Sequence, residues 1–245
     1  MAIFVLSDLH LSTDLSMNKS MEVFGDRWQD YMHKIEKNWN GVVSKDDTVI
    51  LPGDISWATR LEDSYSDLKF LNSLNGKKLI GKGNHDFWWA TTSKMMKFFK
   101  EKGFDSLSIL YNNAYLVEDR IVCGSRGWFP DQSKQVTVGD VDYDKIVSRE
   151  VGRLKLSLNA ALKIQEEIIA SGSDPLPIEV FLHFPPIWFD FCMNEMLEVL
   201  KEYSIKRVYF GHIHGTYSVP RTFERENITF VFTSSDFLNF CPLKI

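Results

Sequence analysis

Five short apolar runs, each followed at once by a polar motif, constrain the fold of this chain more than any other feature. The runs are rich in Val, Ile, Leu and Phe and have the length of single strands, which indicates strands buried on both faces. They cover residues 2–6, 48–51, 78–80, 179–182 and 207–210. Because ligand sites gather at the carboxyl ends of strands in α/β sheets, the five motifs are expected to meet in space.

Helical patterns separate these runs, so an α/β fold is predicted. Apolar side chains recur at i, i+3, i+4 and i+7, as on one face of an amphipathic helix. The stripes run over residues 28–39, 61–74, 92–102, 146–171 and 193–200.

The rest of the chain gives weaker signals. Strand-like runs surround a turn at Asn112-Asn113, and residues 228–233 form another strand candidate. Residues 125–144 are polar and mixed, which predicts a long loop of functional use. No repeat or linker is visible, so residues 1–245 are expected to form a single domain.

The polar motifs contain five of the six histidines. The sixth, His33, falls off its helical stripe and is read as a surface residue. Neutral imidazole together with carboxylate is the ligand set of a transition-metal site, which predicts a two-metal hydrolase. Taken singly, an Asp-x-His or a Gly-Asp is weak evidence, but all of the motifs occur in order after strands. They are Asp8-Leu9-His10, Gly53-Asp54, Gly83-Asn84-His85-Asp86, His183 and Gly211-His212-Ile213-His214.

This series resembles the calcineurin-like metallophosphoesterase superfamily, over Asp8 to His214. Within that superfamily the chain is similar to small bacterial phosphohydrolases that have no cap domain. The resemblance implies a metallo-dependent phosphatase fold, a four-layer α/β/β/α sandwich with two packed mixed β-sheets. One departure is that Gly53-Asp54 continues as Ile55-Ser56-Trp57, where many relatives have a further acid soon after. Trp57, or the tryptophans after Asp86, could then form an apolar wall for substrate.

The resemblance also implies roles for single residues. His85 would donate a proton to the leaving oxygen or bond to a phosphate oxygen, and Asp86 would hold the tautomer of His85. Asn84 and His85 would contact substrate. The metal ligands would be Asp8, His10 and His214 for one ion, Asn84, His183 and His212 for the other, and Asp54 as the bridge between them.

The expected chemistry is direct hydrolysis of a phosphoester by a hydroxide that bridges two divalent cations. A mixed nitrogen and oxygen ligand set favours Mn, Fe, Zn, Co or Ni, and the sequence does not choose among them. Arg126 follows a strand and is a candidate phosphate ligand, since its guanidinium can bind phosphate oxygens in a fork. The alternative is an ordinary loop arginine.

Several functions stay open at this point. The favoured one is a phosphoesterase acting on a phosphomonoester or phosphodiester, with a small molecule as substrate. A nuclease, a cyclic-nucleotide phosphodiesterase and a protein phosphatase are enzymatic alternatives, and a non-catalytic interaction scaffold is the alternative from another class. The net charge of −5 counts against long nucleic acids as partners.

Cellular context follows from composition. Three widely spaced cysteines form neither a disulfide framework nor a CxxC pair. No stretch approaches the roughly 18 apolar residues of a membrane span, and the apolar run at residues 2–6 is too short for a signal sequence. A cytoplasmic protein without membrane contact is expected. The oligomeric state is not predicted.

Overall fold

Two β-sheets packed face to face form the centre of the structure, a computed structural model that describes residues 1–13, 19–129, 142–189 and 191–245. In the first sheet β13 is antiparallel to β1 and the remaining neighbours are parallel. Its strands lie in the order β13 (Leu243–Lys244), β1 (Ile3–Val5), β2 (Thr48–Leu51), β3 (Lys77–Ile80) and β4 (Leu107–Ile109).

The second sheet has parallel strands at its centre and an antiparallel strand at each edge. Its order is β11 (Thr222–Arg225), β12 (Ile228–Phe232), β10 (Arg207–Phe210), β7 (Ile178–Leu182), β6 (Arg120–Ser125) and β5 (Ala114–Val117). A short hairpin of β8 (Ile187–Trp188) and β9 (Phe191–Cys192) stands apart from it.

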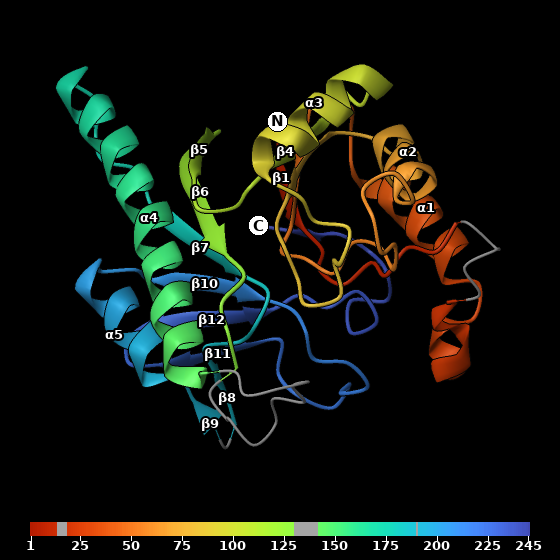
Figure 1. Cartoon of the computed structure of the whole chain (residues 1–245). Helices are drawn as coiled ribbons and strands as arrows, with labels where there is room; N and C mark the ends of the chain where they lie inside the picture. The colour runs from red at the N-terminus through yellow and green to blue at the C-terminus, as the bar shows by residue number, and fades with distance from the viewer. Residues whose placement is uncertain (14–18, 130–141, 190) are drawn as a thin grey trace.

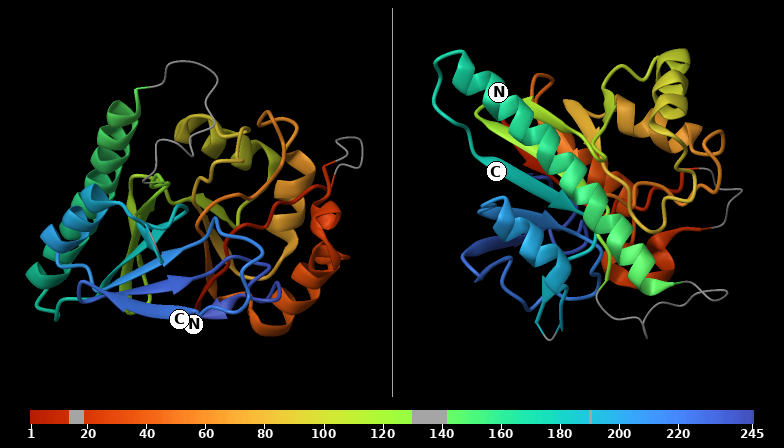
Figure 2. Two further views of the ribbon diagram at one scale, coloured as in Figure 1. Left: turned by 90° about the horizontal axis from the view of Figure 1, so that it is seen from below. Right: turned by 60° about the vertical axis from the view of Figure 1, so that its left-hand side comes forward.

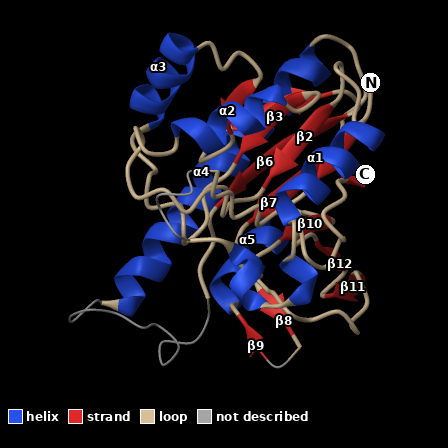
Figure 3. Ribbon diagram, turned by 90° about the vertical axis from the view of Figure 1, so that its right-hand side faces the viewer, coloured by secondary structure: helices blue, strands red, loops and turns tan. Residues whose placement is uncertain are grey.

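Helices cover the outer face of each sheet and complete four layers (Figures 1 and 2). Figure 3 looks onto the side that carries α1 and α2. The first sheet is covered by α1 (Tyr31–Val42), α2 (Tyr65–Ser73) and α3 (Thr92–Lys102), and the second by α4 (Tyr143–Ala170) and α5 (Asn194–Glu202). The predicted α/β/β/α sandwich with two packed mixed sheets is therefore confirmed.

The alternation of side chains along each strand explains the layers. In β1, Phe4 packs toward the helices, whereas Ile3 and Val5 face the other sheet. In β7, Phe181 faces the first sheet and stacks on Tyr209 with ring centroids 4.6 Å apart. Because successive side chains point to opposite faces, a strand that is apolar throughout can fill two cores at once.

Two predicted helix starts need adjustment. The stripe that begins at Trp28 becomes helical only at Tyr31, because the backbone of Asp30 is left-handed, with a φ of 51°. Trp28 itself lies in a 3-10 helix, η3 (Asp26–Trp28). A first 3-10 helix, η2 (Met21–Phe24), precedes it. The second stripe begins at 61, but α2 begins at Tyr65. The Asn112-Asn113 turn joins β4 of one sheet to β5 of the other. Much of the predicted loop at 125–144 lies outside the described residues, at 130–141.

The five polar motifs follow β1, β2, β3, β7 and β10, as predicted, so both sheets contribute to one region. Among the described residues, no helix is long and apolar enough to cross a membrane.

Candidate metal centre

The loops that follow β1 and β2 lie side by side and support each other. The backbone N–H of Asp8 donates to the carbonyl of Gly53 at 3.0 Å, and that of His10 donates to the carbonyl of Asp54 at 2.9 Å. Asp8, His10 and Asp54 all have left-handed backbones, with φ of 61°, 46° and 52°. Each left-handed backbone conformation costs roughly 1–2 kcal/mol in a residue with a Cβ. The contacts between the paired loops must therefore offset this cost and hold the three side chains in place.

Asp54 lies at the centre of the cluster and is almost fully buried. Its Oδ2 is 3.6 Å from Nε2 of His10 and 3.5 Å from Nε2 of His183. His10 follows β1 of the first sheet and His183 follows β7 of the second, so Asp54 stands where the two sheets meet. The structure thus places between two groups of candidate ligands the carboxylate that the sequence predicted as a bridge.

The first predicted ligand set converges on one side of Asp54. Nε2 of His10 lies 3.2 Å from Nε2 of His214, and Nε2 of His214 lies 3.6 Å from Oδ1 of Asp8. Ligand atoms of Asp8, His10 and His214 all fall within 4.8 Å of one another. That spacing suits three ligands of one ion.

The second predicted set converges on the other side. Oδ1 of Asn84 lies 2.6 Å from Nε2 of His183 and 3.0 Å from Nδ1 of His212. Asp8, Asp54 and His183 also place ligand atoms within 4.8 Å of one another. Asp8 therefore borders both halves of the cluster, which the sequence did not indicate.

Electrostatics favour a cation at this place. Burial raises the pKa of Asp8 and of Asp54, and nearby Asp86 and Asp8 raise that of Asp54 further. Burial also lowers the pKa of His10 and His183 well below its usual range. Neutral imidazole lone pairs beside buried carboxylates are what a divalent transition metal binds. The donor set therefore fits such ions.

His212 and His214 differ in their electrostatic surroundings. Burial lowers the pKa of His212 to about 3, and the charge of His214 adds to this effect. Burial would also lower the pKa of His214, but the hydrogen bond to Asp236 and the charge of Asp8 raise it overall. His214 is thus the imidazole that a carboxylate polarises.

Two glycines permit the close approach of the loops. A Cβ on Gly83 would overlap Oδ1 of Asp54, and a Cβ on Gly211 would overlap Oδ2 of Asp8. Gly83 and Gly211 are therefore required because carboxylates that follow other strands lie too close to them for a side chain.

The carboxylate of Asp86 is engaged mainly with backbone groups. Its carboxylate accepts hydrogen bonds from the backbone N–H groups of Asp54, Ile55, Ser56 and Gly83 and from Nε1 of Trp88, at 2.8–3.3 Å. These bonds occupy both oxygens, and none goes to the ring of His85 within the described part of the chain. Asp86 thus fixes the backbone that presents Asp54, and its role toward His85 stays a prediction.

His85 lies at the edge of the cluster. Its backbone N–H donates to Oδ1 of Asp54 at 2.8 Å. Its ring lies 5.5 Å from that of His10 and 4.5 Å from that of Trp57, centroid to centroid. Burial lowers the pKa of His85, and the charge of His214 lowers it further. The side chain is half-buried, so one part of the ring can meet a ligand.

Arg126 borders the cluster through its backbone. Its carbonyl accepts hydrogen bonds from the N–H groups of His183 and Phe184, at 3.1 and 3.0 Å. Its guanidinium pairs with Glu150 at 2.8 Å and stacks over Trp128 at 4.3 Å from the ring centroid. The guanidinium of the predicted phosphate ligand is therefore held in place by Glu150 and Trp128.

Sequence reasoning missed Asp236, which is fully buried. Its Oδ1 lies 2.9 Å from Nδ1 of His214, and its Oδ2 accepts from the N–H of Gly215 at 3.0 Å. A carboxylate in this position fixes the ring and tautomer of a ligand histidine. Asp236 follows strand β12, so the rule that polar groups after strands build the site could have found it.

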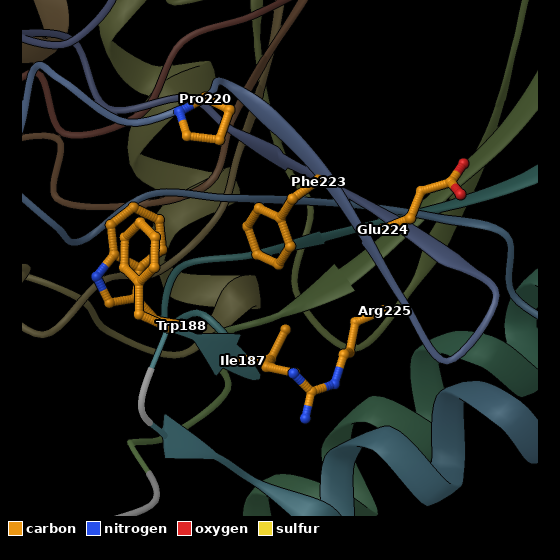
Figure 4. A pocket seen from close by; sticks show the side chains of 7 residues that line it. Ile187, Trp188, Pro220, Phe223, Glu224 and Arg225 are labelled. Atoms are coloured by element: carbon orange, nitrogen blue, oxygen red, sulfur yellow. The ribbon is translucent and has the colours of Figure 1, made fainter.

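An apolar cavity of about 200 Å³ lies between the β8–β9 hairpin and β11 (Figure 4). Ile187, Trp188 and Phe223 line it, with Glu224 and Arg225 also on its wall. None of its lining residues belongs to the five motifs, so it is separate from the cluster around Asp54.

Two packed sheets that share buried imidazoles and carboxylates are the arrangement of a metallophosphoesterase. The chain belongs to the calcineurin-like phosphoesterase family, whose model matches residues 1–216. Membership implies metal-dependent hydrolysis of phosphoesters in general.

One solved structure supports this fold. TT1561 of Thermus thermophilus is similar over 99% of this chain and 97% of its own, with 10% identity and a TM-score of 0.59. AQ665 from Aquifex aeolicus, a protein of unknown function, is 16% identical over 99% of this chain and 95% of its own, with a TM-score of 0.48. No curated protein matches the chain significantly.

Proposed function

We propose that this protein is a two-metal phosphoesterase that hydrolyses a small phosphomonoester or phosphodiester. The observation that carries the proposal is the position of Asp54 between two ligand groups. His10 and His183 approach the same oxygen of Asp54, at 3.6 and 3.5 Å, from opposite groups. One carboxylate oxygen shared in this way is suited to link two cations.

The ligand groups would divide as the family resemblance implies. Asp8, His10 and His214 would hold one ion, and Asn84, His183 and His212 the other. Two divalent ions at these places would supply charge neutralisation for the phosphate and a water that is acidic enough to ionise near neutral pH. Mn, Fe, Zn, Co and Ni all suit this mixed set.

The chain itself would orient and protonate the substrate. His85 projects its half-buried ring beside His10 and is therefore placed to bond to a phosphate oxygen or to pass a proton to the departing alcohol oxygen. Trp57 stacks on the ring of His10 and is tilted against that of His85, with centroids 4.9 and 4.5 Å away, and would shield that edge of the site from water. The carboxylate of Asp86 would hold the loop of Asp54 in position, because it accepts hydrogen bonds from the backbone of that loop.

The test compares p-nitrophenyl phosphate with bis-p-nitrophenyl phosphate as substrates of the protein supplied with Mn²⁺. Metal-dependent release of nitrophenol from either supports the proposal, and the ratio of the two kcat/KM values tells a monoesterase from a diesterase. A protein that binds Mn²⁺ and hydrolyses neither these esters nor a wider set of small phosphoesters would contradict it.

A further inference from the structure

A second apolar cavity, of about 280 Å³, adjoins the candidate metal centre. Its apolar lining comes from two places in the chain, the 3-10 helix η2 and the loop after β2 that also carries Asp54. The lining residues are Lys19, Ser20, Val23, Phe24 and Trp57. The cavity is therefore built between η2 and a loop of the metal centre.

Trp57 connects this cavity to the metal centre. Its ring stacks on that of His10, with centroids 4.9 Å apart, and lies 4.5 Å from the ring of His85. Its backbone N–H donates to the carbonyl of Leu11 at 3.1 Å, so the loop after β1 holds it in place. One indole thus borders the cavity, a proposed metal ligand and the residue proposed to assist the departing alcohol.

Val23 and Phe24 present large apolar side chains to solvent at this cavity. They are 80% and 68% exposed, although both belong to η2. The helix is fixed on its other side, because Met21 is buried and Oε1 of Glu22 accepts the backbone N–H of Asp30 at 2.9 Å. Neighbouring exposed apolar side chains that line a cavity are typical of a ligand site, since a ligand would remove them from water.

The segment that carries this wall is tied to the metal centre. In η3, which follows η2 after Gly25, Nε of Arg27 donates to the carbonyl of Asp236 at 2.7 Å. The ring of Trp28 stands edge-on to that of His214, with centroids 5.5 Å apart. The position of η2 beside the centre is therefore set by contacts with a proposed ligand and its support.

We propose that this cavity binds the alcohol part of the substrate, and that this alcohol carries an aromatic ring. An apolar cavity of about 150 Å³ can hold benzene, so a cavity of about 280 Å³ has room for one or two rings. The flat faces of Trp57 and Phe24 suit contacts with such a ring. This inference rests on the proposed phosphoesterase function and narrows its substrate.

A polar ring fits this lining less well than an apolar one. The hydrogen-bonding edge of a nucleobase would lose water against Val23, Phe24 and Trp57, and burial without a partner is costly. The expected substrate is therefore a phosphoester of an apolar aromatic alcohol, in preference to a nucleotide.

The kinetic test compares ethyl phosphate with 2-phenylethyl phosphate, each as the monoester and as the methyl diester, by release of the alcohol from the metal-loaded protein. Both alcohols ionise alike, because the ring is two carbons from the oxygen. The ring should raise kcat/KM by about tenfold. Phe24→Ala should remove most of that gain, mainly through KM, and leave turnover of the ethyl ester within about twofold. Equal losses on both esters, or no gain in the unaltered protein, would overturn the proposal.

Control variants and a control substrate locate the ring. Phe189→Ala removes a similarly exposed phenyl, 65% exposed, from the other apolar cavity and should keep the gain. Phe24→Leu keeps an apolar wall and should keep part of it. The ester of 2-(uracil-1-yl)ethanol should be hydrolysed about as fast as the ethyl ester. Loss of the gain in Phe189→Ala, or an equal gain from the uracil ring, would contradict the proposal.

A binding measurement tells failure of the cavity from failure of the proposed function. In metal-free full-length protein with isotope-labelled tryptophan, 2-phenylethanol should shift the indole N–H signal of Trp57, which is assigned by its loss in Trp57→Phe. Phe24→Ala should weaken this binding by about fivefold or more, and Phe189→Ala should not. If that pattern holds while no phosphoester is hydrolysed, the ring-binding cavity stands and the function falls. If esters are hydrolysed while the Trp57 signal does not respond, the function stands and the cavity assignment falls.

Discussion

Nε2 of His183 lies 3.5 Å from Oδ2 of Asp54, although the two residues follow strands of different sheets. The contact joins the sheets at the carboxyl ends of β2 and β7. Any group bound between these atoms also binds the two halves of the fold together. Metal binding should therefore raise the stability of the whole protein, as binding to the folded state alone requires.

Experiment should distinguish the histidines that are proposed as metal ligands from His85, which is not. His212→Ala removes a proposed ligand next to Asn84 and should lower the bound metal content together with activity. His85→Ala should keep the metals and lower kcat by ~100-fold or more, because the proposed role of His85 is to assist the reaction and not to hold an ion. Metal analysis and kinetics on the same samples give the answer. Metal loss in His85→Ala equal to that in His212→Ala would show that His85 is a ligand.

Asp236 should tune the metal site without touching an ion. Asp236→Asn weakens the support of His214 and should lower metal affinity by ~10–100-fold. Tyr217→Phe removes a 3.1 Å hydrogen bond to the other oxygen of Asp236 and should have a smaller effect. Titration of the metal-free variants with Mn²⁺ measures both. The prediction fails if the two variants weaken binding equally.

Gly83 should tolerate no side chain. In Gly83→Ala the new Cβ would overlap Oδ1 and the backbone of Asp54, so the variant should lose about 1–3 kcal/mol of unfolding free energy and most of its activity. Gly41→Ala, in helix α1 and with open space around it, should gain up to about 1 kcal/mol instead. Urea unfolding and ester hydrolysis report on both. An active Gly83→Ala of normal stability would mean that the two loops are farther apart than in this structure.

Lys78 should make stability depend on alkaline pH. Its ammonium is buried and donates to the carbonyl of Leu74, and burial lowers the pKa of Lys78 to about 8 from a usual 10.5. Between those values the unfolded chain holds the extra proton, so the free energy of unfolding rises with pH in that window. Relative to Lys78→Met, the unaltered protein should gain about 2–3 kcal/mol from pH 8 to pH 10.5.

Urea unfolding of the two proteins at several pH values measures that difference. The contributions of the other titrating groups to the free energy of unfolding cancel, because both proteins share them. Lys77→Met, at an exposed neighbouring position, should show no comparable pH dependence relative to the unaltered protein. Parallel stability curves for the unaltered protein and Lys78→Met would contradict a shifted pKa at Lys78.

Much of the fold could be predicted because the turn residues mark the ends of the same segments that the apolar runs mark as strands or helices. The strands at residues 48–51 and 207–210 and the helix Thr92–Lys102 end where turn residues follow apolar runs. Helix starts were predicted less well, since the stripe of apolar residues continues through the turn that precedes α1. The left-handed backbone of Asp30 ends that turn, and no side-chain pattern marks it.

The candidate site was predictable to the extent that its residues follow strands in sequence. The predicted contact of Asp86 rested on its proximity to His85 in the sequence, whereas the structure also brings backbone groups some 30 residues away to its carboxylate. Asp236 was missed because it has no histidine beside it. The ion pair between Arg126 and the buried Glu150 was also missed, because it forms only when α4 packs against the second sheet.

The central claim is that Asp54 links two metal ions, and metal content measured together with activity tests it most directly. The unaltered protein should bind about two Mn²⁺ or related ions per chain and hydrolyse an aryl phosphoester. Asp54→Asn should retain at most one ion and lose ~1000-fold or more in kcat/KM. Asp47→Asn, a buried carboxylate before the opposite end of β2, should keep both ions and near-normal activity. An Asp54→Asn protein with two ions and undiminished kcat/KM would contradict the account.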